Sequence, residues 1–109
     1  MITKHQILVF KRSADTLFEL KDFTSATILY FKTLFAIHDF VLEDKIGQSP
    51  KDHSERFRFL EIHFAQLYRE LDKEFSTYRD TYSKIIDKDT CLRIKKLVDH
   101  DLEQYNIEK

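Results

Sequence analysis

Glycine and proline are almost absent from this sequence, and their scarcity constrains the fold more than any other feature. The 109 residues include one glycine, Gly47, and one proline, Pro50. Strand-rich folds need many tight turns, and tight turns depend on these two residue types. The composition therefore predicts an all-α fold of long helices. It also excludes a glycine-rich phosphate-binding loop, which needs several glycines for the backbone to approach the phosphate.

Apolar periodicity predicts four helices, arranged as an antiparallel up-and-down bundle in a single domain spanning residues 1–109. The sequence Gly47 to Asp52 is the clearest loop, because the residue before Pro50 is disfavoured in a helix and a glycine suits the position after one. The expected helices cover about 3–20, 22–45, 51–75 and the residues after Asp87. Leu60, Phe64 and Leu71 are expected in the core.

The second expected helix is apolar around most of its circumference. Beyond its main apolar stripe it carries Phe31, Phe35 and Leu42. In a four-helix bundle of this size, one face of each helix normally contacts water, so these side chains would form an exposed apolar patch. We therefore expect a two-fold symmetric homodimer with these three residues in its interface.

Total charge and hydropathy favour neither membranes nor nucleic acids. The formal net charge is -1, so any binding to nucleic acid must come from a local basic patch. No uninterrupted apolar run has the length of a membrane span or a secretory signal. We expect a cytoplasmic protein without a membrane partner.

No arrangement of side chains in the sequence identifies catalytic residues. Cys91 is the sole cysteine, so an internal disulfide and a zinc site built on Cys pairs are excluded. No two histidines have the i, i+4 spacing of metal ligands on one helix. Among them, only His38 stands out, because it lies within an apolar stripe. We predict neither a metal nor a cofactor.

A polar segment between the last two expected helices is the main candidate binding site. It contains Tyr78, Arg79, Asp80, Tyr82 and Lys84. Arginine can bind phosphate through a fork of donors, and tyrosine rings can stack on bases. The alternative is a tethering turn, in which the tyrosines pack on the bundle and Arg79 pairs with Asp80 or with a helix C-terminus.

A secondary anion site is expected at the start of the third helix. His53, Arg56 and Arg58 lie there, and a helix N-terminus attracts anions. The alternative is that Asp52 or Ser54 only caps the helix and the arginines are solvated.

The layout resembles the HEPN superfamily, named for its occurrence in higher eukaryotes and prokaryotes and for nucleotide binding. The resemblance lies in residues 20–26 and 32–36, and more sharply in the run from Tyr78 to Tyr82. It implies a helical bundle that dimerises. Many members of that family are metal-independent ribonucleases, often toxins or partners of a nucleotidyltransferase-like antitoxin.

The active motif of that family is an arginine, usually followed by a polar residue, with a histidine about five positions on. Arg79 and Asp80 match the first two positions, and Lys84 stands where the histidine would be. Because cleavage in the family relies on that histidine, the resemblance implies a nucleotide- or RNA-binding module, one half of a two-gene, toxin–antitoxin-like system. Two alternatives stay open: an endoribonuclease in which Tyr82, Lys84 or another histidine acts instead, and a structural protein-interaction bundle.

Overall fold

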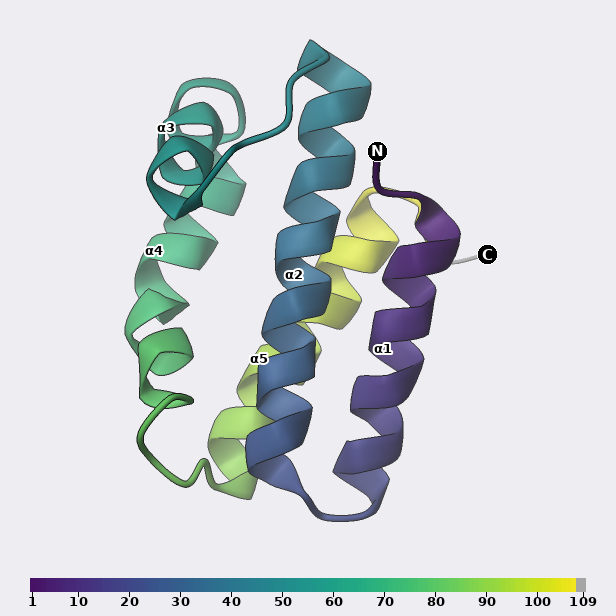
Figure 1. The fold of residues 1–109 in the computed structure, drawn as a ribbon, viewed down its shortest axis with the longest axis vertical. Helices are drawn as coiled ribbons and strands as arrows, with labels where there is room; N and C mark the ends of the chain where they lie inside the picture. Colours follow the sequence, from purple (N-terminus) through teal and green to yellow (C-terminus); the bar gives the residue numbers. More distant parts are fainter. Residues whose placement is uncertain (108–109) are drawn as a thin grey trace.

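The computed structural model describes residues 1–107, and over that range its regular structure is entirely helical (Figure 1). The predicted all-α class is confirmed. The described residues form five helices and no strand: α1 (Lys4–Glu19), α2 (Phe23–Ile46), α3 (His53–His63), α4 (Ala65–Asp80) and α5 (Lys88–Gln104).

The helix α2 occupies the centre of the fold. It packs most extensively against α1 and then α5, and it also contacts α3 and α4. Figure 1 shows α1 and α4 on opposite sides of α2, with α5 passing behind it. The neighbours of α2 in its own chain therefore cover most of its circumference, which explains its apolar composition.

This central position corrects the interface expected from the sequence. Phe31 and Leu42 are completely buried inside the chain, and Phe35 is partly buried. The Phe31 ring lies 5.4 Å from the ring of Tyr78 in α4. The two buried side chains therefore form no exposed patch for a second copy to cover. Dimerisation therefore stays a prediction, and the buried residues Phe31 and Leu42 no longer give a reason for it.

The same helix has a length and apolarity that would suit a membrane span. The 24 residues of α2 include an 18-residue stretch with a mean hydropathy of 1.2. Within the structure, 61% of that stretch is buried among the other helices. The central helix of a folded domain shares these properties with a membrane span, and burial accounts for them here.

The helix boundaries follow the capping residues visible in the sequence. Four side chains each accept a hydrogen bond from a backbone N–H of the first turn that follows: Thr3, Asp22, Asp52 and Asp87. Gly47 ends α2 in the left-handed conformation, with φ of 69°, and its N–H donates to the carbonyl of Glu43. The position of Gly47 after the second helix is confirmed, and of the two candidate caps of the third helix, Asp52 and Ser54, the structure has Asp52.

Two other turns place non-glycine residues in the left-handed region. Lys21, between α1 and α2, has φ of 64°, and Asn106, after α5, has φ of 55°. Such a conformation is unfavourable for a residue with a Cβ atom, and asparagine tolerates it better than lysine does. The N–H groups of Lys21 and Asp22 donate to the carbonyls of Phe18 and Leu17, both at 3.0 Å, so backbone hydrogen bonds accompany this turn without a glycine.

The third expected helix, over residues 51–75, is divided into α3 and α4 at Phe64. This residue has φ of -141° and ψ of 72°, and it lies between the last residue of α3 and the first of α4. In Figure 1, α3 is seen almost end-on while α4 runs along the long axis. Leu60 and Leu71 are buried, as predicted, whereas Phe64 is only partly buried at the break.

Candidate functional site

The two tyrosines of the segment 78–84 form a pair at the end of α4. Their hydroxyl oxygens lie 2.7 Å apart, and their rings meet edge to face with centroids 5.5 Å apart. Residues four apart on a helical turn share a face, which explains the pairing. Tyr82 is largely exposed, whereas Tyr78 is packed against aromatic rings from α2, α3 and α4.

This tyrosine pair lines a hollow of about 270 Å³ on the side facing α2. Its remaining lining residues are Ile28, Lys32, Phe35 and Thr81. The Lys32 ammonium lies 5.0 Å from the centroid of the Phe10 ring, a cation–π contact with α1. The hollow therefore combines aromatic rings with one cation.

Arg79 faces a different part of the surface. It lines an open groove of about 550 Å³ between α3 and α4. The other lining residues are Ser54, Phe57, Arg58, Glu61, Tyr68, Asp72, Phe75 and Ser76. The Arg79 guanidinium carbon lies 5.5 Å from the centroid of the Phe75 ring. The structure thus separates Arg79 from the tyrosine pair and brings it together with Arg58, a residue of the secondary anion site.

Both arginines of this groove have guanidinium groups available to a ligand. Within residues 1–107, Arg79 forms no ion pair. Arg58 makes one long contact of 3.8 Å with Glu55, and its side chain is 65% exposed. Exposed pairs of this kind contribute little free energy, so a phosphate could displace the contact.

The remaining charged residues of the segment pair with each other. The Lys84 ammonium lies 3.4 Å from a carboxylate oxygen of Asp80, one helical turn earlier. Both side chains are exposed. The pairing of Arg79 with Asp80, which the alternative of a tethering turn included, is absent among the described ion pairs, and Asp80 pairs with Lys84.

Arg56, expected in the exposed anion site, is instead buried between α3 and α2. Only 8% of its surface is exposed. One guanidinium nitrogen donates to an Asp39 carboxylate oxygen at 3.0 Å, and another lies 2.8 Å from Nδ1 of His53. The guanidinium also lies 4.9 Å from the centroid of the Phe35 ring. Arg56 therefore joins two helices and does not face solvent as an anion site would require.

His53 is also part of this internal cluster. Its ring packs against Phe35 at 4.7 Å and against Phe75 and Tyr78 at 5.4 Å between centroids. Burial, followed by the nearby Arg56 charge, lowers the pKa of His53. The imidazole is thus held neutral and accepts the hydrogen bond from Arg56, so of the three predicted residues only Arg58 faces an open groove.

His38 lies deeper in the same region. It is completely buried, and neither ring nitrogen has a hydrogen-bond partner among the described residues. Burial, followed by the charges of Arg56 and His53, lowers the pKa of His38 to about 3. The imidazole is therefore neutral, and its two polar atoms lack the partners that buried groups normally have.

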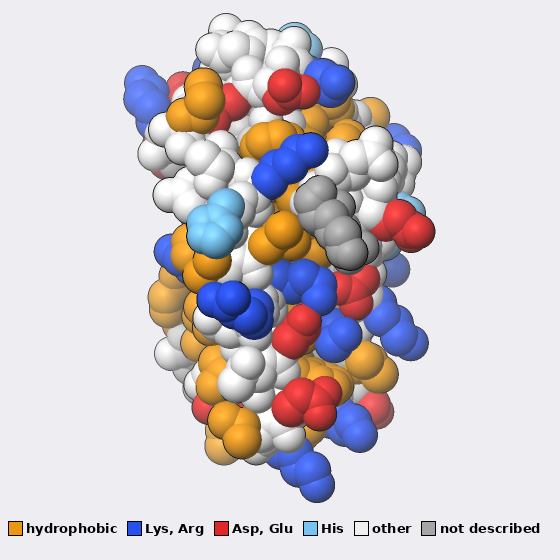
Figure 2. Space-filling view, turned by 90° about the vertical axis from the view of Figure 1, so that its right-hand side faces the viewer, with side chains coloured by type: hydrophobic (Ala, Val, Ile, Leu, Met, Phe, Trp, Pro, Cys, Tyr) orange, Lys and Arg blue, Asp and Glu red, His pale blue; other side chains and the backbone are white. Residues whose placement is uncertain are grey.

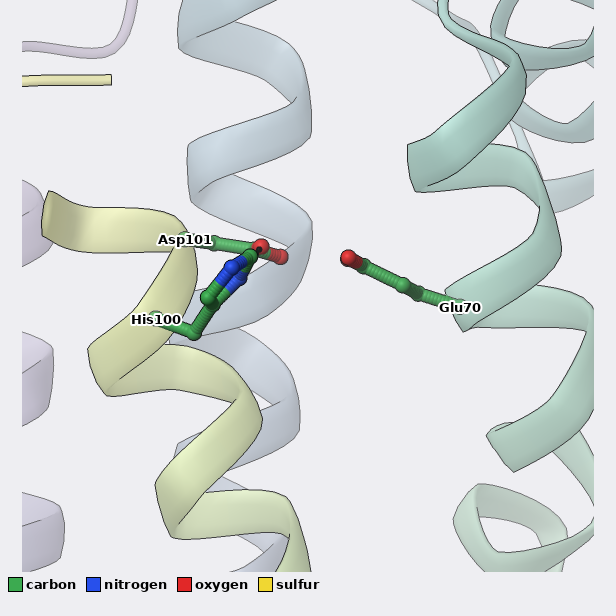
Figure 3. Close-up of side chains that lie close together, drawn as sticks. All are labelled: Glu70, His100 and Asp101. Carbon is green, nitrogen blue, oxygen red and sulfur yellow. Dashed lines mark hydrogen bonds and ion pairs between the residues drawn. The ribbon is translucent and has the colours of Figure 1, made fainter. Parts of the chain in front are cut away.

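A third cluster joins Glu70 of α4 to His100 and Asp101 of α5, and the sequence reasoning missed it. Figure 3 shows the two carboxylates pointing toward each other, with the His100 ring beside Asp101. The three groups place one nitrogen or oxygen each within 4.8 Å of the others. Burial, followed by Glu70, raises the pKa of Asp101 to about 9. Spacing along one helix cannot indicate this set, because its members come from two helices far apart in the sequence.

Comparisons with known proteins assign no family to the chain. No protein-family model matches it, no curated protein matches it, and no solved structure matches it.

Proposed function

We propose that this protein is a HEPN-like module that binds a nucleotide or a short single-stranded RNA in the groove between α3 and α4. The observation that carries the proposal is the meeting of Arg58 and Arg79 in one open groove. These residues come from two separate sequence segments, each of which suggested an anion site. Two guanidinium groups can hold a phosphate through several parallel hydrogen bonds.

Aromatic side chains beside the arginines suit the rest of a nucleotide. Phe57 meets Phe75 edge to face at 5.0 Å and Tyr68 at 6.1 Å between centroids. All three line the groove. Bases stack on aromatic rings without strong sequence preference, so this wall favours a base or sugar next to the bound phosphate.

The charges in the groove limit the size of the ligand. Glu61 and Asp72 line it together with the two arginines, so the formal charges of these four groups cancel. Both carboxylates raise the pKa of Tyr68, with Glu61 the stronger influence, and the phenol therefore stays protonated. Figure 2 shows the α1 side of the molecule, where basic and acidic side chains alternate without a continuous basic track. In the groove itself, two arginines beside two carboxylates fit a ligand with few phosphates better than a long polyanion.

The proposal is for binding and not for cleavage. His53 packs against Tyr78, yet its Nδ1 is engaged by Arg56 and its ring is partly covered by aromatic side chains. In this proposal, α1, α2, α4 and α5 would correspond to the four helices that the HEPN resemblance implies, and α3 would be a short crosswise helix before the third of them. A homodimer and a nucleotidyltransferase-like partner in a two-gene system belong to the same proposal.

Titration of nucleotides and a short single-stranded RNA into the purified protein at low salt tests this function. We expect Arg79→Ala and Arg58→Ala each to weaken binding roughly tenfold, about 1.4 kcal/mol. Each should also reduce the slope of log affinity against log salt by about 1. Arg69→Ala is the matched control, because Arg69 is an exposed arginine of α4 that does not line the groove.

Circular dichroism should show that all three variants keep their helices. Equal binding by Arg79→Ala, Arg58→Ala and wild type, or no binding by wild type, would contradict the proposal. Electrophoresis of the RNA after incubation in chelator reports cleavage separately from binding. Shortening of the RNA by wild type but not by Arg79→Ala would favour the ribonuclease alternative.

A further inference from the structure

Glu70, His100 and Asp101 place two carboxylates and an imidazole at one point between α4 and α5 (Figure 3). We propose that these three residues bind a divalent transition-metal ion such as Zn²⁺. The site would join α4 to α5 independently of the groove that holds Arg79.

The donor atoms are close enough to surround one ion. Each of the three residues offers an atom within 4.8 Å of the other two. Bonds of about 2.0–2.1 Å from zinc to nitrogen or oxygen place neighbouring donors of a tetrahedral site about 3.4 Å apart. His100 Nδ1 and one Asp101 oxygen already lie 3.2 Å apart. Small side-chain rotations of Glu70 would complete the set.

Two buried carboxylate oxygens face each other, and no donor from another described residue lies between them. Asp101 is completely buried, and its Oδ2 atom has no hydrogen-bond partner among the described residues. The Oε1 atom of Glu70 is buried and unpartnered as well. Figure 3 shows both carboxylates aimed into the space between the helices. Buried polar atoms are almost always partnered in proteins, so either a shared proton or a cation has to lie between these two oxygens.

The two carboxylates have little compensating positive charge among the described residues. Within residues 1–107, no lysine or arginine forms an ion pair with Glu70 or Asp101. His100 provides the one ion-pair contact, at 3.2 Å from Asp101. Two facing carboxylates are stable together only with a cation or a shared proton between them. A divalent cation would satisfy both oxygens at once.

A hydrogen bond already orients one of the ligands. The side-chain amide nitrogen of Gln66 donates to Glu70 Oε2 at 3.2 Å, and it also lies 3.4 Å from the side-chain oxygen of Gln104. This leaves Glu70 Oε1, the unpartnered atom, directed at the cluster. Hydrogen bonds of this kind fix the orientation of metal ligands, so Gln66 is a positioning residue for the site.

The donor types select the class of metal. One imidazole nitrogen with two carboxylate oxygens suits zinc and other first-row transition metals better than calcium or magnesium, which prefer oxygen alone. Three protein ligands leave one position of a tetrahedral zinc site for water or another small ligand. The His100 side chain is 56% exposed, so that position can be reached from solvent.

Titration of Zn²⁺ into protein previously dialysed against chelator tests the proposal. We expect one equivalent to bind and to raise the thermal midpoint of the wild type by several degrees. Glu70→Gln and Asp101→Asn should weaken binding on the order of 100-fold, since each removes a ligand. Glu103→Gln is the matched control, because Glu103 is an exposed carboxylate on the same helix.

The role of Gln66 is tested with Co²⁺ as a spectroscopic probe. We expect Gln66→Ala to weaken metal binding roughly tenfold and to alter the visible absorption of bound Co²⁺. A side chain that only contributed to stability would leave that spectrum unchanged.

Two results would overturn the metal site. The first is that Zn²⁺ neither shifts the thermal midpoint of the wild type nor produces a binding signal in calorimetric titration. Glu70 and Asp101 would then share a proton instead of a metal ion. The other is equal affinity of Glu70→Gln and Glu103→Gln, which would place the ion elsewhere. Asp101 is completely buried, so Asp101→Asn could fail to fold. Glu70 is only partly buried and Glu70→Gln keeps its shape, so this second variant tests the site even then.

Discussion

The interior shared by α1, α2 and α5 differs in chemistry from the interior shared by α2, α3 and α4. The buried residues of α1 and α5 are mostly small or aliphatic: Ile7, Ala14, Cys91, Ile94, Val98, Asp101 and Leu102. The main aromatic exception on this side is Tyr30 of α2, which is completely buried and donates a hydrogen bond to Asp15 of α1. On the other side of α2, aromatic and ionisable side chains meet, with Phe35, His53, Phe75 and Tyr78 in mutual contact and Arg56 buried beside them.

The difference in side chains corresponds to a difference in packing. Contacts of α2 with α1 and α5 are more extensive than its contacts with α3 and α4. Small and aliphatic residues let helices interdigitate at high density, whereas rings and a guanidinium need specific partners and geometry. We infer that buried apolar area dominates the stability of the aliphatic interior. In the aromatic interior, particular pairs should matter more.

The largest expected effect is in the aliphatic interior. Ile94 is completely buried on α5. Ile94→Ala should lower the free energy of unfolding by about 2–5 kcal/mol, since it removes apolar contacts and leaves a cavity. Urea denaturation of the variant and wild type measures the change. A loss below about 1 kcal/mol would mean that the α2–α5 contact adapts easily and that the proposed contrast is wrong.

Arg56→Met should have an intermediate effect in the aromatic interior. The substitution keeps the apolar volume near Phe35 but removes the ion pair with Asp39. The Asp39 side chain is 30% exposed, so water can partly replace the lost partner, and we expect a loss of about 2 kcal/mol.

A double-mutant cycle separates the ion pair from packing. If Arg56 acts through Asp39, Asp39→Asn should cost less in the Arg56→Met background than in wild type. Additive effects of the two substitutions would show that Arg56 stabilises the protein through its contacts with Phe35 and His53 instead.

The smallest effect at neutral pH is expected for His38→Leu. The substitution removes two buried nitrogens without partners and keeps an apolar side chain of similar size. We expect the free energy of unfolding at pH 7 to change by less than about 1 kcal/mol, in either direction. The informative measurement is its dependence on pH.

The pKa of His38 in the folded protein, about 3, lies below its ordinary value of 6.5. The unfolded chain therefore binds a proton before the folded chain does. Above pH 6.5 this residue costs no stability. Below it, wild type should lose roughly 1.4 kcal/mol per pH unit through His38, down to about pH 3. In thermal melts from pH 7 to pH 4, the stability of His38→Leu should fall less steeply than that of wild type. The control is His5→Leu, at an exposed histidine, whose stability should follow wild type over the same pH range.

Local sequence signals predicted the secondary structure well because their physical causes are local. Asp22, Asp52 and Asp87 cap helices through hydrogen bonds to residues three positions away, and Gly47 ends α2 by its own conformation. The break at Phe64 has no such signal, since neither glycine nor proline is near it. An apolar periodicity that continues across a break cannot distinguish one long helix from two.

The candidate sites were less predictable, because they depend on which faces of different helices meet. The sequence indicated Arg58 and Arg79 separately, and only the packing of α3 against α4 placed them in one groove. The sequence also suggested that Arg56 is exposed, whereas it is buried against Asp39 of α2. Glu70 and Asp101 gave no signal at all, since their proximity arises between α4 and α5.

The sequence by itself determined the all-α class, the ends of most helices and the apolar character of α2. These properties follow from backbone preferences and from hydrogen bonds between residues close in the chain. Tertiary structure alone decided that α2 is covered by its own chain, that Arg79 lies apart from Tyr78 and Tyr82, and that two carboxylates face each other. The physical reason is that burial, ion pairing and pKa depend on neighbours across helices, which local spacing does not specify.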